Sequence, residues 1–189
     1  MEKVVDIVRI VTLVLALIMV LIRYIYRKKK MKRYGIKTFK ELEKLEKELE
    51  KVMDIYYKIY KKVEHDSNLR YLNDNEKTLY IAITTQKMIR NLGFFAFFTI
   101  NGNLSNDIVN VFNELGLEEL ANICQEAIDA LGFKIPETIE TNDILLEENI
   151  DEKIINKLEE CNSKFLDYST EKFKKAMCDY FIKNKEYFE

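Results

Sequence analysis

Carboxylates are the residues of this sequence best suited to chemistry, and they are concentrated in residues 101–160. That stretch has fifteen Asp and Glu against three Lys, a net charge of −12, whereas the 189-residue chain as a whole carries −2. Clustered carboxylates serve acid–base catalysis, binding of hard cations, or electrostatic binding of a basic partner. The fifteen acids are Asp107, Glu114, Glu118, Glu119, Glu126, Asp129, Glu137, Glu140, Asp143, Glu147, Glu148, Asp151, Glu152, Glu159 and Glu160.

The spacing of these acids gives acid–base catalysis little support. Three pairs are adjacent in the chain: Glu118-Glu119, Glu147-Glu148 and Glu159-Glu160. Neighbouring side chains on a helix point about 100° apart and do not converge, and a catalytic pair also needs one member in a low-dielectric cleft. The chain has one histidine, a poor basis for a Ser/His/Asp triad. We expect no enzyme, no catalytic residue and no cofactor.

Metal and phosphate motifs are also missing from the sequence. Residues 143–151 lack the Asp-x-Asp-x-Asp-Gly spacing of a calcium loop, and no Gly-rich phosphate loop, nucleophile elbow or zinc pattern is present. The three cysteines, Cys124, Cys161 and Cys178, form no CxxC pair, which is typical of buried thiols in a reducing compartment. We expect no metal site.

Electrostatic binding is the remaining use of the acids. Duplex DNA carries one negative charge per roughly 1.7 Å of its axis, and carboxylates fixed at similar spacing can attract the basic groove of a DNA-binding protein. The alternative is a solvated acidic surface that only confers solubility. Charge alone leaves both interpretations open.

Two amphipathic helical patterns position the central acids. Apolar residues follow the spacing of one helix face in each pattern: Ile108, Val111, Phe112 and Leu115 in the first, and Leu117, Leu120, Ala121, Cys124, Ala127, Ile128 and Leu131 in the second. The acids of these helices then take the opposite, exposed face. The candidate protein-binding residues are Glu114, Glu118, Glu119, Glu126 and Asp129.

An aromatic run supplies the surface against which these helices pack. The pairs Phe94-Phe95 and Phe97-Phe98 cannot all point one way on a helix, so we expect protein around most of them; a ligand box of aromatic side chains is the alternative. Further amphipathic helices are expected from residue 73, over 151–166, where Ile155 should face inward, and after a cap at Ser169 or Thr170. Ser105 or Asn106 should cap the helix that carries Ile108, and a long connection over 133–149 should hold a short helix near 143–148. Residues 73–189 are thus predicted to form an all-α bundle of about five or six helices.

The N-terminal segment, residues 1–33, has the pattern of a membrane anchor. Residues 4–22 are apolar except for Asp6, Arg9 and Thr12, and 19 helical residues span about 28 Å, close to the hydrocarbon thickness. A cleaved signal peptide is the alternative, but the apolar run lacks a small-x-small site after it. We therefore expect an uncleaved single transmembrane helix.

Basic residues that follow the apolar run predict its orientation. Seven cations lie between residues 23 and 33, against two before or within the span, and positive flanks stay on the cytoplasmic side. The prediction is a single-pass protein of the inner membrane with its C-terminal domain in the cytoplasm. Because the span already explains these cations, we expect no direct binding of nucleic acid.

Residues 34–72 form a charged heptad segment. Thr38 followed by Glu41 has the spacing of a capping box, and beyond it the apolar residues alternate steps of three and four, as in a coiled-coil seam. The stripe either packs on its own domain or forms a parallel homodimer stalk. Its members are Leu42, Leu45, Leu49, Val52, Tyr56, Ile59 and Val63.

The aromatic run also resembles a motif of a bacterial domain family, mostly of unknown function, similar to the C-terminal domain of a DNA-mimic protein. The family carries a motif like Val-x-Asn-Gly-Gly-Phe-x-Gln-Phe-Phe-x-Asn, and Leu92, Ala96 and Ile100 depart from it here. The resemblance continues through Leu115-Gly116-Leu117, through Cys161-Asn162 to Phe165, and to Asn184 to Phe188, and so covers about residues 70–189. The matching motif residues are Ile89, Asn91, Gly93, Phe94, Phe97 and Phe98.

The resemblance implies a structural role for Asn91, Gly93, Phe94, Phe97 and Phe98, and a mimic that occupies the DNA-binding face of a basic regulator. We therefore predict a membrane-anchored, cytoplasm-facing, non-catalytic protein-binding module with a basic protein partner. The first alternative is an immunity-type protein that neutralises a toxin through the same acidic face. The second is a hydrolase that uses the acidic residues.

Overall fold

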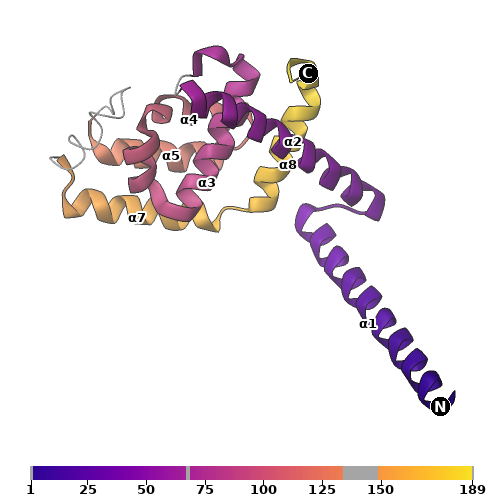
Figure 1. The fold of residues 1–189 in the computed structure, drawn as a ribbon. Coiled ribbons are helices and arrows are strands. Elements are labelled where there is room, and N and C mark those ends of the chain that lie inside the picture. The colour runs from indigo at the N-terminus through magenta and orange to yellow at the C-terminus, as the bar shows by residue number, and fades with distance from the viewer. Residues whose placement is uncertain (1, 67–68, 134–148, 189) are drawn as a thin grey trace. The chain divides into compact units, whose positions relative to one another are not determined.

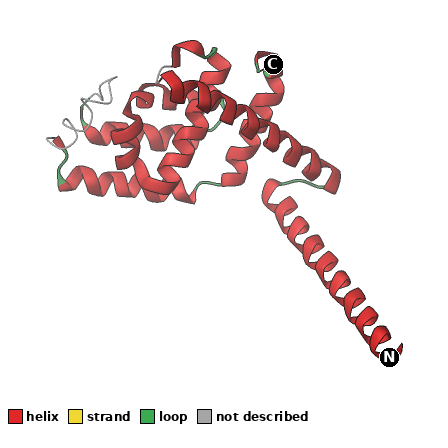
Figure 2. Ribbon diagram, viewed as in Figure 1, coloured by secondary structure: helices red, strands yellow, loops and turns green. Residues whose placement is uncertain are grey.

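The structure is a computed structural model that describes residues 2–66, 69–133 and 149–188; for residues 2–10, 65 and 66 it describes the backbone only. Every regular element in these ranges is helical, with no strand (Figure 1, Figure 2). The prediction of an all-α protein is therefore confirmed. The chain divides into two compact units, residues 1–47 and 48–189, which are described separately below.

The first unit contains helix α1, Glu2–Tyr34, and the start of helix α2, Phe39–Asp66. Met31, Tyr34 and Leu42 form its small buried core. The Thr38 hydroxyl accepts a hydrogen bond of 3.2 Å from the Glu41 backbone N–H, which satisfies one of the donors left free at a helix start. The predicted start of this helix is confirmed.

The apolar part of α1 is exposed along its length. The large apolar side chains between Val11 and Ile22 are each 46 to 68% exposed. Where side chains are described, no helix has both the length and the apolar character needed to cross a membrane. The transmembrane helix expected over residues 4–22 is therefore not supported by the described residues.

The heptad stripe packs within its own chain. In the second unit Val52, Tyr56 and Ile59 are 1 to 3% exposed, and in the first unit Leu42 is fully buried. The Tyr56 ring stacks on Tyr80 of the next helix, with 6.1 Å between ring centroids. The structure therefore has the first of the two predicted arrangements, and the homodimer stays a prediction.

The second unit adds five described helices to the end of α2. In this unit α5 packs against α4 and α7, and α7 also packs against α3 (Figure 1). Short 3₁₀ turns lie at residues 69–71, 102–104 and 185–187. The α-helices are α3 (Asp74–Asn101), α4 (Ser105–Glu114), α5 (Glu118–Leu131), α7 (Glu152–Asp167) and α8 (Thr170–Lys183).

Three helices of the second unit, α3, α7 and α8, begin with a side-chain cap, and α4 does not. Asn73 forms a full capping box with Glu76 at the start of α3, and the side chains of Asp151 and Ser169 cap α7 and α8. The predicted cap of α4 at Ser105 or Asn106 is wrong, because Ser105 is already helical and its hydroxyl donates to the carbonyl of Gly102.

Gly93 bends α3 in the middle of the family motif. Its φ of 82° and ψ of 174° interrupt the helix, and only glycine adopts this region readily. The bend frees the Phe94 N–H, which donates a buried hydrogen bond of 2.7 Å to the Asn162 Oδ1 of α7. A Cβ atom on residue 93 would lie 2.8 Å from the Asn162 Nδ2, so glycine is required for contact as well as conformation.

The aromatic run forms the core of the second unit. Phe94, Phe97 and Phe98 are fully buried, whereas Phe95 is 46% exposed. Phe165 of α7 meets Phe94 edge to face with 5.6 Å between centroids. Core packing, rather than a ligand box, is therefore what these residues do, because their rings contact one another and α7.

Two other predictions need correction or fall outside the described chain. Ile155 was expected to face inward but is 46% exposed, because the buried side of α7 is completed by Leu158, Cys161 and Phe165. The expected short helix near residues 143–148 lies outside the described residues.

Candidate protein-binding surface

Ten of the fifteen acids in residues 101–160 lie in the described part of the chain, and all ten are exposed. The other five fall within residues 134–148, outside that part. The ten acids come from α4, α5 and the beginning and middle of α7 with its cap. They are Asp107, Glu114, Glu118, Glu119, Glu126, Asp129, Asp151, Glu152, Glu159 and Glu160.

Helix α5 separates its apolar and acidic residues cleanly. Its buried face includes Leu120, Ala121, Cys124 and Ala127, each no more than 1% exposed. Burial raises the pKa of the Cys124 thiol well above its ordinary value, so this group stays protonated and unreactive at neutral pH. The acidic face carries Glu118, Glu119, Glu126 and Asp129, all exposed. The predicted amphipathic pattern of α5 is confirmed.

Acids of α5 and α7 meet around one surface depression. It has a volume of about 840 Å³ and is lined by Asp129 from α5, by Asp151, which caps α7, and by Glu152 and Glu160 of α7. Two lysines, Lys153 and Lys157, line the same depression. The packing of α5 on α7 therefore brings together carboxylates that are far apart in the sequence.

Ion pairs neutralise part of this charge. Lys157 lies 2.8 Å from the Glu160 carboxylate, and this hydrogen bond lowers the pKa of Glu160. Lys164 of α7 pairs with Glu126 of α5. Exposed pairs of this kind contribute little to stability, but each removes one negative charge that a partner would meet. Glu118 and Glu119 form no ion pair with any described residue.

Glu114 differs from the four acids of α5. Its carboxylate accepts hydrogen bonds from the hydroxyls of Thr78, at 3.0 Å, and Tyr180, at 3.2 Å. It therefore joins α4 to α3 and α8. Glu114 also borders a depression of about 630 Å³ that contains Lys172 and Lys175. Glu114, one of the predicted site residues, is thus exposed but hydrogen-bonded within the protein, and it lies beside lysines.

Tyr180 is the centre of that network. Burial raises the pKa of Tyr180 to about 12. The nearby negative charge of Glu114 also raises it, because it opposes ionisation of the phenol. Its hydroxyl also lies 2.9 Å from the Asn75 Oδ1 at the start of α3. The phenol therefore stays protonated at neutral pH and acts as a structural donor between helices.

Sequence patterns did not reveal two residues that fix the position of α7. Asn162 accepts the hydrogen bond from Phe94 already described. Arg90 of α3 donates from Nη2 to the carbonyls of Leu166, at 3.3 Å, and Tyr168, at 2.6 Å, at the C-terminal end of α7, where carbonyls lack helical partners. The one available signal was that Asn162 lies in the segment from Cys161 to Phe165 where the chain resembles the family.

Among the described residues, no three His, Cys, Asp or Glu side chains lie close enough to hold a metal ion. The ten described acids form an exposed surface on α4, α5 and α7 with its cap. The fold and this surface define a small all-helical domain whose exposed carboxylates are concentrated on α5 and α7.

Comparison with known proteins identifies the family of this domain. The family model described as DMP19-like protein, the family of DNA mimic protein 19, matches residues 70–185. The chain belongs to this family. The match runs from just before α3 to just beyond α8, and so contains the motif around Gly93, the Asn162 contact and the acidic helices. It confirms the resemblance inferred from the motif. No curated protein and no solved structure matches the chain.

Proposed function

We propose that the protein is a non-catalytic DNA mimic whose acidic surface binds the basic face of a DNA-binding protein. The acidic surface is defined as the eight exposed acids of α5 and of residues 151–160, the cap and first part of α7: Glu118, Glu119, Glu126, Asp129, Asp151, Glu152, Glu159 and Glu160. The observation that supports the proposal is that α5 and α7 pack together, that all eight carboxylates are exposed, and that four of them, Asp129, Asp151, Glu152 and Glu160, line one depression. Membership of the DMP19-like family supports the same role.

The physical basis is attraction between fixed charges. A groove that evolved to bind phosphates presents Lys and Arg at the spacing of the duplex. Carboxylates held on two packed helices meet those cations without the cost of ordering a flexible segment. The attraction speeds association and weakens as salt screens the charges. Glu114 is left outside the acidic surface because its carboxylate is used within the protein.

The test compares two sets of neutralised acids. The first variant carries Glu118→Gln, Glu119→Gln and Asp129→Asn. The matched control carries Glu50→Gln, Asp54→Asn and Glu186→Gln, which removes the same numbers of exposed Glu and Asp from α2 and the C-terminal turn. Binding to a panel of purified bacterial nucleoid proteins and transcription regulators is measured at 50 and 300 mM salt.

The proposal predicts that at least one of these proteins binds the wild type, and that binding weakens at the higher salt. The first variant should lose roughly ten- to hundredfold in affinity, and the control variant should bind like the wild type. Equal loss in both variants, or binding that survives high salt, contradicts the acidic surface as the binding site.

An immunity-type protein is the second candidate function, because the same acidic surface can cover a basic toxin. The two functions differ in the partner and in its relation to DNA. A regulator or nucleoid protein that competes with DNA supports mimicry, whereas a co-encoded toxin whose activity is blocked supports immunity.

We also propose that α1 attaches the protein to the inner membrane as a single-pass anchor, with the second unit in the cytoplasm. The proposal rests on the exposed apolar side chains from Val11 to Ile22, since continuous exposed apolar surface marks a site of interaction. The seven cations of residues 23–33 suit an anionic headgroup surface, at about 1 kcal/mol for each cation near it.

Vesicle flotation tests the membrane proposal. Full-length protein should float with vesicles that contain phosphatidylglycerol, and a Leu17→Lys, Leu21→Lys variant should float at least tenfold less, because each charge opposes burial in hydrocarbon. Tyr71→Lys changes an exposed side chain outside α1 and serves as the control. Protein that stays with vesicles in carbonate is inserted, and equal flotation of all three proteins contradicts attachment through α1.

A further inference from the structure

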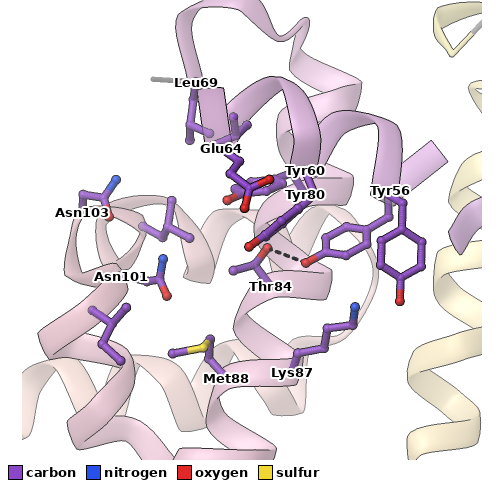
Figure 3. A pocket seen from close by; sticks show the side chains of 14 residues that line it. Tyr56, Tyr60, Glu64, Leu69, Tyr80, Thr84, Lys87, Met88, Asn101 and Asn103 are labelled. Atoms are coloured by element: carbon purple, nitrogen blue, oxygen red, sulfur yellow. Dashed lines mark hydrogen bonds between the residues drawn. The ribbon is translucent and has the colours of Figure 1, made fainter. Parts of the chain in front are cut away.

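A cavity lined by tyrosines lies in the second unit, apart from the acidic surface. Its lining residues come from α2, α3 and the turns at residues 69–71 and 102–104, and none comes from α5 or α7 (Figure 3). Its volume is about 540 Å³, within the range of roughly 300 to 1,000 Å³ that is typical of small-molecule sites. The proposed binding of a basic protein does not use this cavity.

Aromatic rings form one wall of the cavity. Tyr56 and Tyr80 are 3 and 6% exposed and stack on each other, and the Tyr56 hydroxyl lies 3.3 Å from the Thr84 hydroxyl. Burial raises the pKa of both tyrosines, so they stay neutral. Tyr60 is 41% exposed and lies near Tyr80 in Figure 3. Its ring is therefore available to stack on a flat ligand at the cavity mouth.

Lys87 gives the cavity a positive charge. Its Nζ lies 4.3 Å from the ring centroid of Tyr56 and 4.9 Å from that of Tyr57, so cation–π contacts fix its position. No carboxylate in the described chain forms an ion pair with it. The carboxylate in the lining, Glu64, is exposed. The cavity thus contains a positioned cation whose hydrogen-bonding capacity is open to an anion.

The remaining sides supply apolar contact and amide groups. Met88 and Lys87 lie below the tyrosine rings in Figure 3, and Asn101 and Asn103 lie to the left of them. Met88 offers a polarisable surface to a ring, and each amide can both donate and accept hydrogen bonds. Flat apolar walls with a few polar groups are typical of a site for one small planar molecule.

We propose that this cavity binds a small planar aromatic acid, with the ring against Tyr60, Tyr80 and Met88 and the carboxylate or phosphate paired with Lys87. An aromatic cation is the rival ligand, since tyrosine faces attract ammonium groups. Lys87 already occupies the faces of Tyr56 and Tyr57, however, and a second cation in the same cavity would be repelled by it. An aromatic acid gains from the ion pair of its charged group with Lys87 and from contact of its own ring with the tyrosine rings.

Three naphthalene probes that differ in charge test the proposal on the full-length protein. They are 2-naphthoate, 2-naphthamide and 2-naphthylmethylammonium, and binding is followed by changes in the amide and methyl NMR signals. For a ligand of this size we expect a dissociation constant for naphthoate on the order of 1 mM. The amide should bind roughly tenfold more weakly because it lacks the charge-assisted contact.

Two variants locate the binding. Lys87→Met keeps an unbranched side chain over the tyrosines and should reduce naphthoate affinity to that of the amide, whereas Lys61→Met, at an exposed lysine of α2, should leave it unchanged. Tyr60→Leu should weaken all three probes. Three results would each overturn the proposal. They are tighter binding of the ammonium probe than of naphthoate, an unchanged preference of Lys87→Met for naphthoate over the amide, and no naphthoate binding at 10 mM.

Discussion

The junction between α3 and α7 and the acidic surface on α5 and α7 use their polar residues in opposite ways. At the junction, Gly93, Phe94 and Asn162 are joined by one buried hydrogen bond of 2.7 Å and by a contact that leaves no room for a Cβ. On the acidic surface, Glu118 and Glu119 are exposed and form no ion pair with a described residue. The junction is explained by folding, whereas Glu118 and Glu119 make no ion pair within the described chain that would explain them in the same way.

The contrast between the junction and the acidic surface shows that a family match can report a shared fold without reporting the function of the surface. The family match covers the motif around Gly93, where the bend and its buried partner constrain the residues. A protein can keep that junction while its surface charge varies, since fold alone does not determine function. Substitutions should therefore divide into two classes: at the junction they change stability, and on the acidic surface they change binding.

Gly93→Ala should have the largest effect on stability. The new Cβ would lie 2.8 Å from the Asn162 Nδ2, at a φ of 82°, so steric overlap adds to backbone strain. We expect a loss of about 3 kcal/mol or more in the free energy of unfolding. Urea denaturation followed by circular dichroism measures it. A loss below about 1 kcal/mol would show that the bend is not required.

Asn162→Ala should have the next largest effect. It leaves the buried Phe94 N–H without its acceptor, which costs about 1 to 3 kcal/mol. Asn162→Asp is the matched control, because a carboxylate oxygen at the same place still accepts the bond. Equal destabilisation by Ala and Asp in the same urea experiment would contradict the assigned role of this hydrogen bond.

Glu114→Ala and Glu118→Ala sharpen the comparison within neighbouring acids. Loss of Glu114 removes the acceptor of the Thr78 and Tyr180 hydroxyls and should lower the free energy of unfolding by about 1 kcal/mol. It should leave the affinity for the partner protein unchanged. Loss of Glu118 should change the free energy of unfolding by less than about 0.5 kcal/mol and should lower the affinity for the partner protein. If both variants changed stability and partner affinity to the same extent, Glu114 and Glu118 would not have the different roles assigned to them.

The smallest expected effect is at high pH. Because burial raises the pKa of Tyr180 to about 12, above the usual value near 10, the unfolded chain loses this proton first. The contribution of Tyr180 to stability is then complete below about pH 10 and is lost as the pH rises toward 12. Tyr180→Phe should remove that part of the decline, and identical pH profiles would contradict the raised pKa.

Periodicity and capping predicted most of the helices. The apolar pattern of α5, the Asn73 cap and the buried Phe94, Phe97 and Phe98 all follow from local rules and agree with the structure. Ile155 fits the helical period yet is exposed, because periodicity marks a face and does not fix its edge. Local pattern therefore sufficed where one helix face met the core.

Contacts between distant residues could not be predicted in the same way. Phe94 and Asn162 are 68 positions apart, and Glu114 and Tyr180 are 66 apart. The sequence could place Glu114 on the polar side of α4, but only the packing of α8 showed that a tyrosine hydroxyl reaches it. The tyrosine cavity was missed for the same reason, since Tyr56 and Tyr80 match core positions of separate helices.

Displacement of DNA is the most direct test of mimicry. A fluorescent DNA duplex is bound to the DNA-binding protein that the panel identifies, and its anisotropy is followed as wild type or the Glu118→Gln, Glu119→Gln, Asp129→Asn variant is added. The account predicts that the wild type releases the duplex and that the variant needs at least tenfold more protein. A ternary complex in which the duplex stays bound would contradict DNA mimicry.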